Sequence, residues 1–207
     1  MMDLTVPYYD AVMETFDAGH HPRFAVPAGF SISGWREGFE HDWARIECAA
    51  EGMRSTEYAL GIFRREFPDE DLRRTRCLFA LNAAGVPVAT ASLWPGDTMG
   101  DVLPRVHYVA TDPAYDGLGL CKALLTALFD VAAAEKLGDR IYLTTQSPSY
   151  PAIGLYLQFG FRPVWKRPVR WHHDDFQPEQ AWLVIRERLA AYYASLGRPS
   201  ALSALQP

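Results

Sequence analysis

Alternating apolar and polar positions predict a strand over 106–111, followed by a helix that begins near Leu118. Asp112-Pro113 ends the strand, because proline donates no ladder hydrogen bond and restricts the residue before it. Apolar side chains at helical spacing indicate the helix: Leu120, Leu124, Leu125, Leu128 and Val131. The chain therefore contains a strand, a turn with two glycines and a helix in direct succession.

The same patterning predicts the other elements of the chain. Strands are expected at 30–35, 76–82, 86–94, 140–145 and 161–169, the last of them an edge strand interrupted by two prolines. Helices are expected around Trp43, Ile46 and Cys48, from Ser55 to Phe67, at 151–159 and at 177–196. Residues 4–9 fit either an edge strand or a covering arm, and residues 197–207 are expected to fray.

This order of elements is typical of an α/β protein with a mixed sheet, because an antiparallel hairpin precedes a strand–helix–strand crossover. No internal repeat divides the chain further. We expect an N-terminal arm at 1–29, one principal domain at 30–176, and a C-terminal helix at 177–207 packed on that domain.

The turn between the strand and the helix has the layout of an anion site. The first turn of a helix has backbone N–H groups without partners, and Gly117 and Gly119 remove the Cβ atoms that block a close approach. A plain strand-to-helix connection explains the same glycines. Two standard phosphate loops are excluded: Lys122 stands where the Rossmann fingerprint needs a small residue, and the P-loop pattern is absent.

The pattern strand-Pro-x-Tyr-x-Gly-x-Gly-Leu-x-x-x-Leu-Leu resembles the acyl-CoA-binding motif of the GNAT superfamily of N-acetyltransferases. The resemblance implies that the glycine turn holds the pyrophosphate of acetyl-CoA. The residues that it assigns to this site are Asp116, Gly117, Leu118, Gly119, Leu120, Cys121 and Lys122. Two positions depart from the family pattern: Asp116 replaces a basic or amide residue, and Cys121 replaces a small one. Lys122 offers a compensating positive charge.

A second stretch, 147–161, is similar to the other signature block of this superfamily, Asn-x-x-Ala-x-x-Leu-Tyr-x-x-x-Gly-Phe. The matching residues are Ala152, Leu155, Tyr156, Gly160 and Phe161, while Ser149 stands in place of the usual asparagine. The resemblance implies that Ser149, Ala152 and Tyr156 contact the cofactor and that Tyr156 protonates the departing thiolate, for which a neutral phenol is a competent donor. The alternative for Tyr156 is an aromatic side chain packed under the sheet.

The resemblance further implies a mixed, mainly antiparallel sheet in which a central parallel pair, 105–111 with 140–145, splays apart, with flanking helices. Pantetheine would follow the backbone of Val109, Ala110 and Thr111, and the Val109 N–H would polarise the thioester carbonyl.

A base for the acceptor amine is less clear. Regular alternation places His107 on the face of Val109 and Thr111, where a histidine suits proton removal at neutral pH. A buried structural histidine is the alternative reading. Glu47 and Glu57, on helices expected over the cleft, are further candidates, and a neutral amine needs no base residue.

Composition excludes several classes of protein. The 207 residues carry a net charge of −5, which argues against nucleic acid as a partner and mildly favours a cationic acceptor. No apolar run is long enough for a membrane helix and no secretory signal is visible, so we expect a cytoplasmic protein. Cys48, Cys77 and Cys121 read as buried thiols. The adjacent histidines of 20–21 and 172–173 do not have metal-ligand spacing, so no metal is expected.

The sequence thus predicts an acyl-CoA-dependent N-acyltransferase that uses acetyl-CoA as co-substrate and a small-molecule or peptide amine as acceptor. A non-catalytic acyl-CoA-binding module is the alternative, and a structural domain that has lost the cofactor is a third possibility. The C-terminal helix is compatible with a homodimer. The loops that would select the acceptor, 36–56, 95–104 and 166–176, carry no signature.

Overall fold

The structure is a computed structural model that describes residues 3–172, 175–197 and 202–205. The chain forms two compact units, and each is described by itself. The first unit contains residues 22–94 and 105–137, and the second contains residues 3–21, 95–104 and the chain from 138 onward. None of the helices in the described ranges combines the length and the apolar character needed to cross a membrane.

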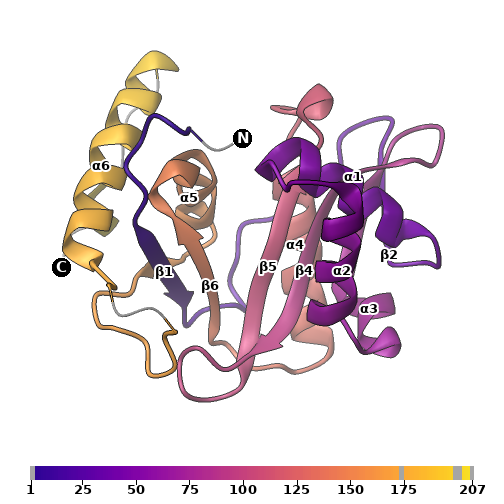
Figure 1. Cartoon of the computed structure of the whole chain (residues 1–207), viewed down its shortest axis with the longest axis horizontal. Helices are drawn as coiled ribbons and strands as arrows, with labels where there is room; N and C mark the ends of the chain where they lie inside the picture. Colours follow the sequence, from indigo (N-terminus) through magenta and orange to yellow (C-terminus); the bar gives the residue numbers. More distant parts are fainter. Residues whose placement is uncertain (1–2, 173–174, 198–201, 206–207) are drawn as a thin grey trace. The chain divides into compact units, whose positions relative to one another are not determined.

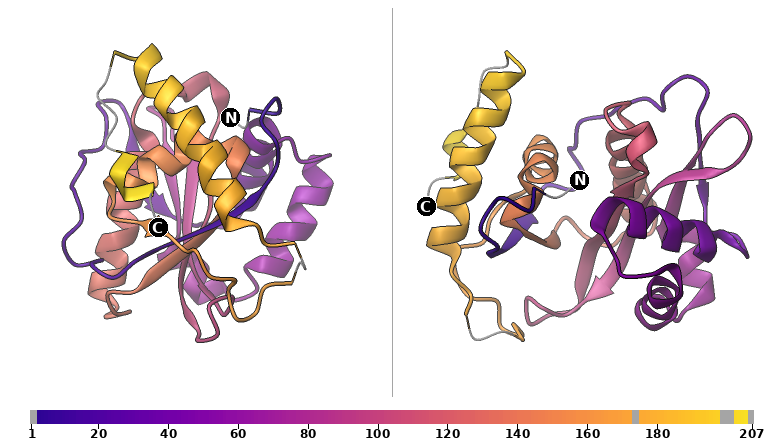
Figure 2. Two further views of the ribbon diagram at one scale, coloured as in Figure 1. Left: turned by 90° about the vertical axis from the view of Figure 1, so that its left-hand side faces the viewer. Right: turned by 45° about the horizontal axis from the view of Figure 1, so that its top comes forward.

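The first unit is a set of antiparallel strands between two helical layers. Its hydrogen-bonded strand order is β2-β3-β4-β5. Helices α1 and α2 cover one face of the strands, and α4 covers the other (Figures 1 and 2). Its elements are β2 (Ser31–Gly34), α1 (Phe39–Glu51), α2 (Thr56–Glu66), α3 (Glu70–Arg76), β3 (Cys77–Leu81), β4 (Pro87–Gly96), β5 (Leu103–Thr111), the 3-10 turn η1 (Pro113–Tyr115) and α4 (Leu120–Ala134).

Helix α2 shows why the sequence folds as predicted here. Ser55 caps the helix, since its Oγ accepts a hydrogen bond of 3.1 Å from the Tyr58 N–H. Phe67 follows the last helical residue, and Pro68 prevents the helix from continuing. The predicted helix from Ser55 to Phe67 is therefore confirmed with its boundaries nearly in place.

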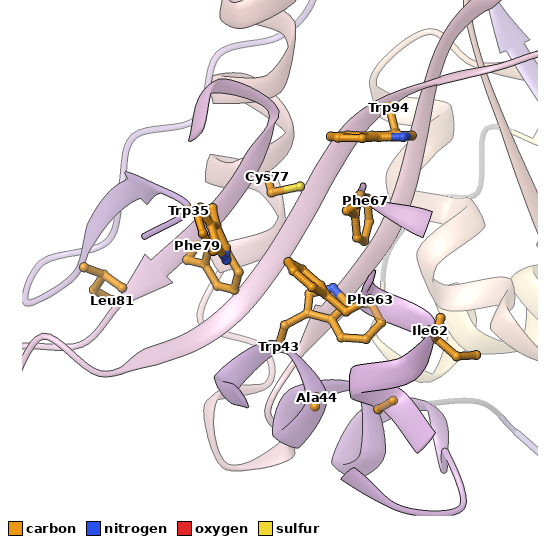
Figure 3. Packing of buried hydrophobic residues seen from close by; sticks show 11 residues of the cluster. Trp35, Trp43, Ala44, Ile62, Phe63, Phe67, Cys77, Phe79, Leu81 and Trp94 are labelled. Atoms are coloured by element: carbon orange, nitrogen blue, oxygen red, sulfur yellow. The ribbon is translucent and has the colours of Figure 1, made fainter. Parts of the chain in front are cut away.

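An aromatic cluster between α1, α2 and the strands forms the core of the first unit (Figure 3). The Trp43 ring lies at the centre, with its centroid 5.2 Å from that of Phe63 and 6.0 Å from that of Phe67. Phe67 in turn meets Trp94 of β4 edge-on at 5.0 Å. Large rings in offset and edge-on contact contribute both buried area and fixed geometry, so α1 and α2 are held firmly over β4 and β5.

The second unit is a three-stranded antiparallel sheet with order β6-β1-β7, covered by two helices. Helix α6 packs on β1 and on α5, which Figure 2 shows from two sides. Its elements are β1 (Asp10–Thr15), β6 (Ile141–Gln146), the 3-10 turn η2 (Ser147–Ser149), α5 (Tyr150–Gln158), β7 (Arg162–Pro163), α6 (Pro178–Ser195) and the 3-10 turn η3 (Leu202–Leu205).

Four expectations about the elements need correction. Of the two readings of 4–9, the edge strand is wrong: the N-terminal strand is Asp10–Thr15, and it lies between β6 and β7. Helix α3 was not expected. The strand expected at 161–169 is reduced to Arg162–Pro163, because Pro163 and Pro168 remove ladder donors. Within the C-terminal stretch that was expected to fray, 202–205 form a turn whose Leu205 is buried.

Candidate active site

The first part of the candidate site is the junction of β5, η1 and α4. β5 ends at Thr111, and Asp112 caps the following 3-10 turn by accepting a hydrogen bond of 3.1 Å from the Ala114 N–H. Helix α4 begins at Leu120, two residues later than expected, because Gly119 adopts a left-handed conformation with a φ of 86° and serves as the N-cap. The predicted succession of strand, glycine turn and helix is confirmed.

Both glycines of the turn are required by the backbone. Gly117 has a φ of 77° and Gly119 a φ of 86°, which is a region that side-chain-bearing residues rarely adopt. No atom of the described residues lies within 4 Å of the position of a Cβ at either glycine. No side chain in the described ranges caps α4, so no side chain there satisfies its first N–H groups. These features fit a bound pyrophosphate.

The other predicted residues of this junction take different positions. Cys121 Sγ lies 3.1 Å from Thr111 Oγ1, which joins the first turn of α4 to the end of β5. Lys122 places its ammonium nitrogen 4.8 Å from the centroid of the Phe24 ring. Asp116 and Leu118 are exposed, and the main chain of Asp116 closes η1 rather than capping α4. Asp116 therefore stays a departure from the family pattern at this turn.

The three cysteines are free, as expected. Only Cys77 is buried, whereas Cys48 and Cys121 are half-buried, which corrects the expectation for these two. Burial, and then the nearby charge of Asp116, raise the pKa of the Cys121 thiol, while the Thr111 hydroxyl lowers it. Cys121 is therefore a thiol rather than a thiolate at neutral pH.

An arginine clamp that the sequence did not reveal holds the end of β5. Arg45 of α1 donates to Asp112 Oδ2 at 2.6 Å, to the Pro87 carbonyl oxygen at 2.6 Å and to Asp42 Oδ1 at 3.2 Å. Asp112 also donates its N–H to the Val88 carbonyl at 2.9 Å. These contacts tie α1 and the start of β4 to the residue at which β5 becomes the glycine turn, so they fix where the turn begins.

The strand β5 is irregular at Tyr108, whose φ of 50° is left-handed backbone in the middle of a strand. His107 Nε2 lies 3.7 Å from Glu66 Oε2 of α2, and the His107 ring centroid lies 6.2 Å from that of Phe67. Tyr108 also contacts Phe67, with ring centroids 5.7 Å apart. Two successive side chains of β5 therefore face the same helical layer.

This irregularity overturns the expected face of His107. Regular alternation puts His107 on the face of Val109 and Thr111. In the structure Thr111 faces α4 through Cys121, whereas His107 faces α2. The prediction that His107 shares a face with Thr111 is wrong, because the left-handed Tyr108 shifts the alternation by one residue.

The surroundings of His107 also weaken it as a base. Burial is the main reason that its pKa falls to about 4, since burial disfavours the charged ring; Arg105 lowers the pKa further and Glu66 opposes the change. The pKa of Glu66 falls to about 2 through its polar contact with His107 and a hydrogen bond of 3.0 Å from Arg65. His107 Nε2 lies 3.7 Å from Glu66 Oε2, which is longer than a hydrogen bond of ordinary geometry.

The other two candidate bases differ in environment. Glu57 lies in the first turn of α2 and is exposed. Glu47 lies on α1 with 1% of its surface exposed, and its Oε1 has no hydrogen-bond partner among the residues that the structure describes. The sequence suggested both residues equally, because it does not show which side of each helix faces the strands.

The second motif lies in the second unit, on η2 and α5. Tyr156 is buried on α5, and its ring meets that of Phe161 edge-on with centroids 5.9 Å apart. Ser149 Oγ accepts a hydrogen bond of 3.0 Å from the Gln146 side chain at the end of β6. Ala152 lies in the first turn of α5 and is half-buried. The expected short helix is confirmed at Tyr150–Gln158, close to the predicted 151–159.

Metal-binding side chains do not gather in the part of the chain that the structure describes, where no group of three or more His, Cys, Asp or Glu is arranged for an ion. His20 Nδ1 instead lies 2.6 Å from Asp17 Oδ1, and His21 Nδ1 lies 3.0 Å from the Ala18 carbonyl oxygen. His173, the second member of the other histidine pair, lies outside the described residues.

The strand, the glycine turn and the uncapped helix of this α/β fold have the layout of an anion site, which fits an acyl-CoA-dependent acyltransferase. The profile of the acetyltransferase (GNAT) family matches residues 37–161, which is more than half of the chain. The protein belongs to the GNAT family of acetyltransferases.

Two curated relatives match parts of the chain. The N-alpha-acetyltransferase RimI of Mycobacterium tuberculosis is 37% identical over 60 residues, which are 29% of this chain and 35% of the relative. An uncharacterised protein of Mycobacterium leprae is 40% identical over 64 residues, which are 31% of this chain and 17% of the relative. The chain thus matches about a third or less of the length of these curated relatives.

A solved structure shows the same fold. The GCN5-related N-acetyltransferase of Sphaerobacter thermophilus superposes with a TM-score of 0.58 at 19% identity, over 76% of this chain and 49% of that one. The likeness confirms the predicted fold class: α/β, with a mixed, mainly antiparallel sheet, one parallel strand pair and flanking helices.

Proposed function

We propose that the protein transfers the acetyl group of acetyl-CoA directly to a primary amine of a small molecule or peptide, without a metal. Val109, Ala110 and Thr111 would pair with the pantetheine arm, and 116–122 would hold the pyrophosphate. When it is bound, acetyl-CoA supplies an activated acyl group as a thioester. The residues of the protein then orient the two reactants and move protons.

The open glycine turn before α4 is the observation that carries this proposal. Gly117 and Gly119 are left-handed, a Cβ at either would meet no described atom within 4 Å outside the adjacent residues, and no side chain in the described ranges caps α4. The positive end of a helix dipole attracts phosphate, and the uncapped N–H groups supply the hydrogen bonds. Arg45 holds the start of the turn through Asp112, so the site is preorganised rather than loose.

Tyr156 is the proposed proton donor to the thiolate that leaves. A phenol is neutral at pH 7, and a hydrogen-bond donor near the sulfur makes the thiolate a better leaving group. Tyr156 lies on the helix of the second motif and is held by packing on Phe161. Fixed packing limits the positions of its hydroxyl, which general acid catalysis requires.

The test is consumption of acetyl-CoA with a panel of polyamines, aminoglycosides, amino acids and peptides with free N-termini. We expect turnover with at least one amine, and we expect Tyr156→Phe to lower kcat by about 10² while the Kd of acetyl-CoA changes less than about twofold. Tyr58→Phe, at an exposed site on α2, is the matched control and should behave as the wild-type protein does. A folded protein that never consumes acetyl-CoA would contradict the proposal.

A non-catalytic acyl-CoA-binding module is the second candidate. Asp116 favours it, because its carboxylate is close enough to the first turn of α4 to raise the pKa of Cys121 and would repel a pyrophosphate there. This candidate predicts acetyl-CoA binding without turnover for every amine of the panel. Replacement of Asp116 by Asn would then strengthen binding without creating activity.

A further inference from the structure

Glu47 is placed on the face of α1 that covers the middle of β5. One turn before it on this face, Trp43 contacts Tyr108 of β5, with ring centroids 5.0 Å apart. One turn after it, Ala50 belongs to a buried cluster with Ile46 and with Ala110 of β5. Residues three and four apart share a face of a helix, so Glu47 lies between these two contacts, over the stretch 108–110. This stretch includes Val109, whose N–H is expected to polarise the thioester carbonyl.

The carboxyl of Glu47 is buried without the contacts that a structural carboxyl makes. It is 1% exposed, yet within the described chain its Oε1 has no hydrogen-bond partner. The nearby cation of α1, Arg45, is already bound to Asp112, Asp42 and the carbonyl of Pro87. A buried carboxyl oxygen without a partner is destabilising when the group is charged, and a structural role would supply a partner.

The groups around Glu47 make its surroundings acidic. On α1 it is flanked by Cys48 and by the half-buried Glu51; β5 contributes Tyr108 and α4 contributes Cys121. Burial first, and then the charge of Glu51, raise the pKa of Glu47 well above its ordinary value. None of the groups just named is a cation, so a positively charged ligand would complete this cluster.

We propose that Glu47 is the proton acceptor for the acceptor amine and that the acceptor arrives as an ammonium ion. The proposal rests on the proposed acetyl transfer and deepens it by naming the base and the charge of the substrate. Glu47 takes this role in place of His107, which faces α2 and whose ring is too weak a base for an ammonium.

The proton balance of the proposed step is complete. The ammonium gives one proton to the carboxylate of Glu47, and the freed lone pair attacks the thioester carbonyl carbon. A C–N bond forms and the C–S bond breaks, and the thiolate takes a second proton as it leaves. The third hydrogen stays on the amide nitrogen, and the proton on Glu47 passes to water, so one ammonium and one thioester give one amide, one thiol and one proton.

The experiment measures kcat/KM for the best amine of the panel from pH 5.5 to 10.5 in the wild-type protein, Glu47→Gln and Glu47→Asp. We expect Glu47→Gln to lower kcat/KM by about 100-fold at pH 7.5, with a deficit that shrinks above about pH 10, where an amine of ordinary pKa is already neutral. Glu47→Asp should recover part of the activity. The Kd of acetyl-CoA should change less than about twofold.

Thermal unfolding of Glu47→Gln separates catalysis from structure. A carboxyl with a raised pKa in the folded state lowers stability as the pH rises above its unfolded value near 4.5, because only the unfolded chain then loses the proton. The amide lacks this effect, so the Tm of Glu47→Gln should equal or exceed that of the wild-type protein, and its advantage should grow from pH 5 to pH 8. A lower Tm for the variant would show a structural role and contradict the proposal.

Two controls complete the design. Glu37→Gln changes an exposed carboxylate just before α1 and should leave the rate and its pH profile within about twofold of the wild-type values. Glu57→Gln changes the rival carboxylate. A large loss in Glu57→Gln, or a wild-type pH profile in Glu47→Gln, would overturn the proposal.

Failure of the inference and failure of the proposed function give different results. If the wild-type protein binds no acetyl-CoA, the proposed function itself fails. If it binds acetyl-CoA without turnover, calorimetric titration of the same amines into the CoA complex tests whether Glu47 contributes to amine binding. Amine binding that Glu47→Gln weakens at least tenfold would support the ammonium site; equal binding by the variant, or no binding of any amine, would contradict it.

Discussion

At the scale of single residues, the buried ring of His107 couples stability to acid pH. Its pKa is about 4 in the folded protein, against an ordinary value of 6.5. As the pH falls below 6.5, the unfolded chain takes up a proton that the folded protein refuses, so stability is lost between pH 6.5 and 4. We expect the wild-type protein to lose as much as ~3 kcal/mol more than His107→Gln over this interval.

Urea unfolding at several pH values measures this difference. His41→Gln, a change at an exposed histidine of α1, is the matched control and should follow the wild-type protein. Glu66, with its pKa lowered to about 2, acts in a separate window, because its contribution is lost only as the pH falls from 4.5 toward 2. Parallel curves for the wild-type protein and His107→Gln between pH 6.5 and 4 would show that the ring is not held neutral.

Single residues also show what the sequence can and cannot reveal about a site. Gly117 and Gly119 were readable, because a turn that needs left-handed backbone requires glycine. The left-handed backbone of Tyr108 could not be predicted, since an alternating strand pattern gives no sign of it. Glu47 was named only as one of several candidates, because charged residues are expected at the surface and its burial depends on how α1 packs.

At the scale of elements, Gly34 joins β2 to α3 through a close approach of two backbones. A Cβ at Gly34 would lie 2.0 Å from the carbonyl oxygen of Arg74. Backbone atoms cannot move aside as a flexible side chain does, so Gly34→Ala must separate the strand from the helix. We expect the free energy of unfolding to fall by about 2–4 kcal/mol, as measured by urea unfolding.

Gly61 provides a matched control for this substitution. It lies inside α2, is exposed, and has no described atom within 4 Å of a Cβ position. Gly61→Ala should therefore stabilise the protein by about 0.5–1 kcal/mol, since alanine favours the helix. Equal effects of the two substitutions would mean that β2 and α3 do not approach as closely as the structure shows.

The elements that the sequence missed lack a periodic signal. In β1 the residues Ala11, Val12 and Met13 are all buried, because neighbours cover both faces, so no alternation appears. Helix α3 buries none of its residues, so its apolar pattern is weak. The sequence features that indicate this helix are its cap and its charges. Asp69 caps the helix, acidic residues occupy the first turn, and arginines occupy the last turn. The long amphipathic α2 and α6 were found, because their apolar faces are buried.

At the scale of the whole molecule, membership of the GNAT family and the open turn before α4 support the same chemistry. The first unit contains the strand, the turn, the arginine clamp and Glu47, and the second contains Tyr156. The order of the elements predicted an α/β protein with a mixed sheet, and the family resemblance supplied the mainly antiparallel arrangement with one parallel pair. The acceptor was not predictable, since it depends on loop side chains without a shared pattern.

The most direct test of this account is calorimetric titration with acetyl-CoA of the wild-type protein, Gly119→Asp, Gly119→Asn and Gly85→Asp. Asp and Asn introduce side chains of similar size at Gly119, so their difference isolates the negative charge. Gly85 in the β3–β4 hairpin also has a positive φ of 78° and no described atom within 4 Å of a Cβ, so Gly85→Asp reproduces the backbone strain away from the turn.

We expect the wild-type protein and Gly85→Asp to bind with a Kd on the order of micromolar, and Gly119→Asp to bind at least about tenfold more weakly than Gly119→Asn. This result would place the pyrophosphate at the glycine turn. Equal binding by all four proteins would move the cofactor away from the turn. No binding by a folded wild-type protein would contradict the acyltransferase account as a whole.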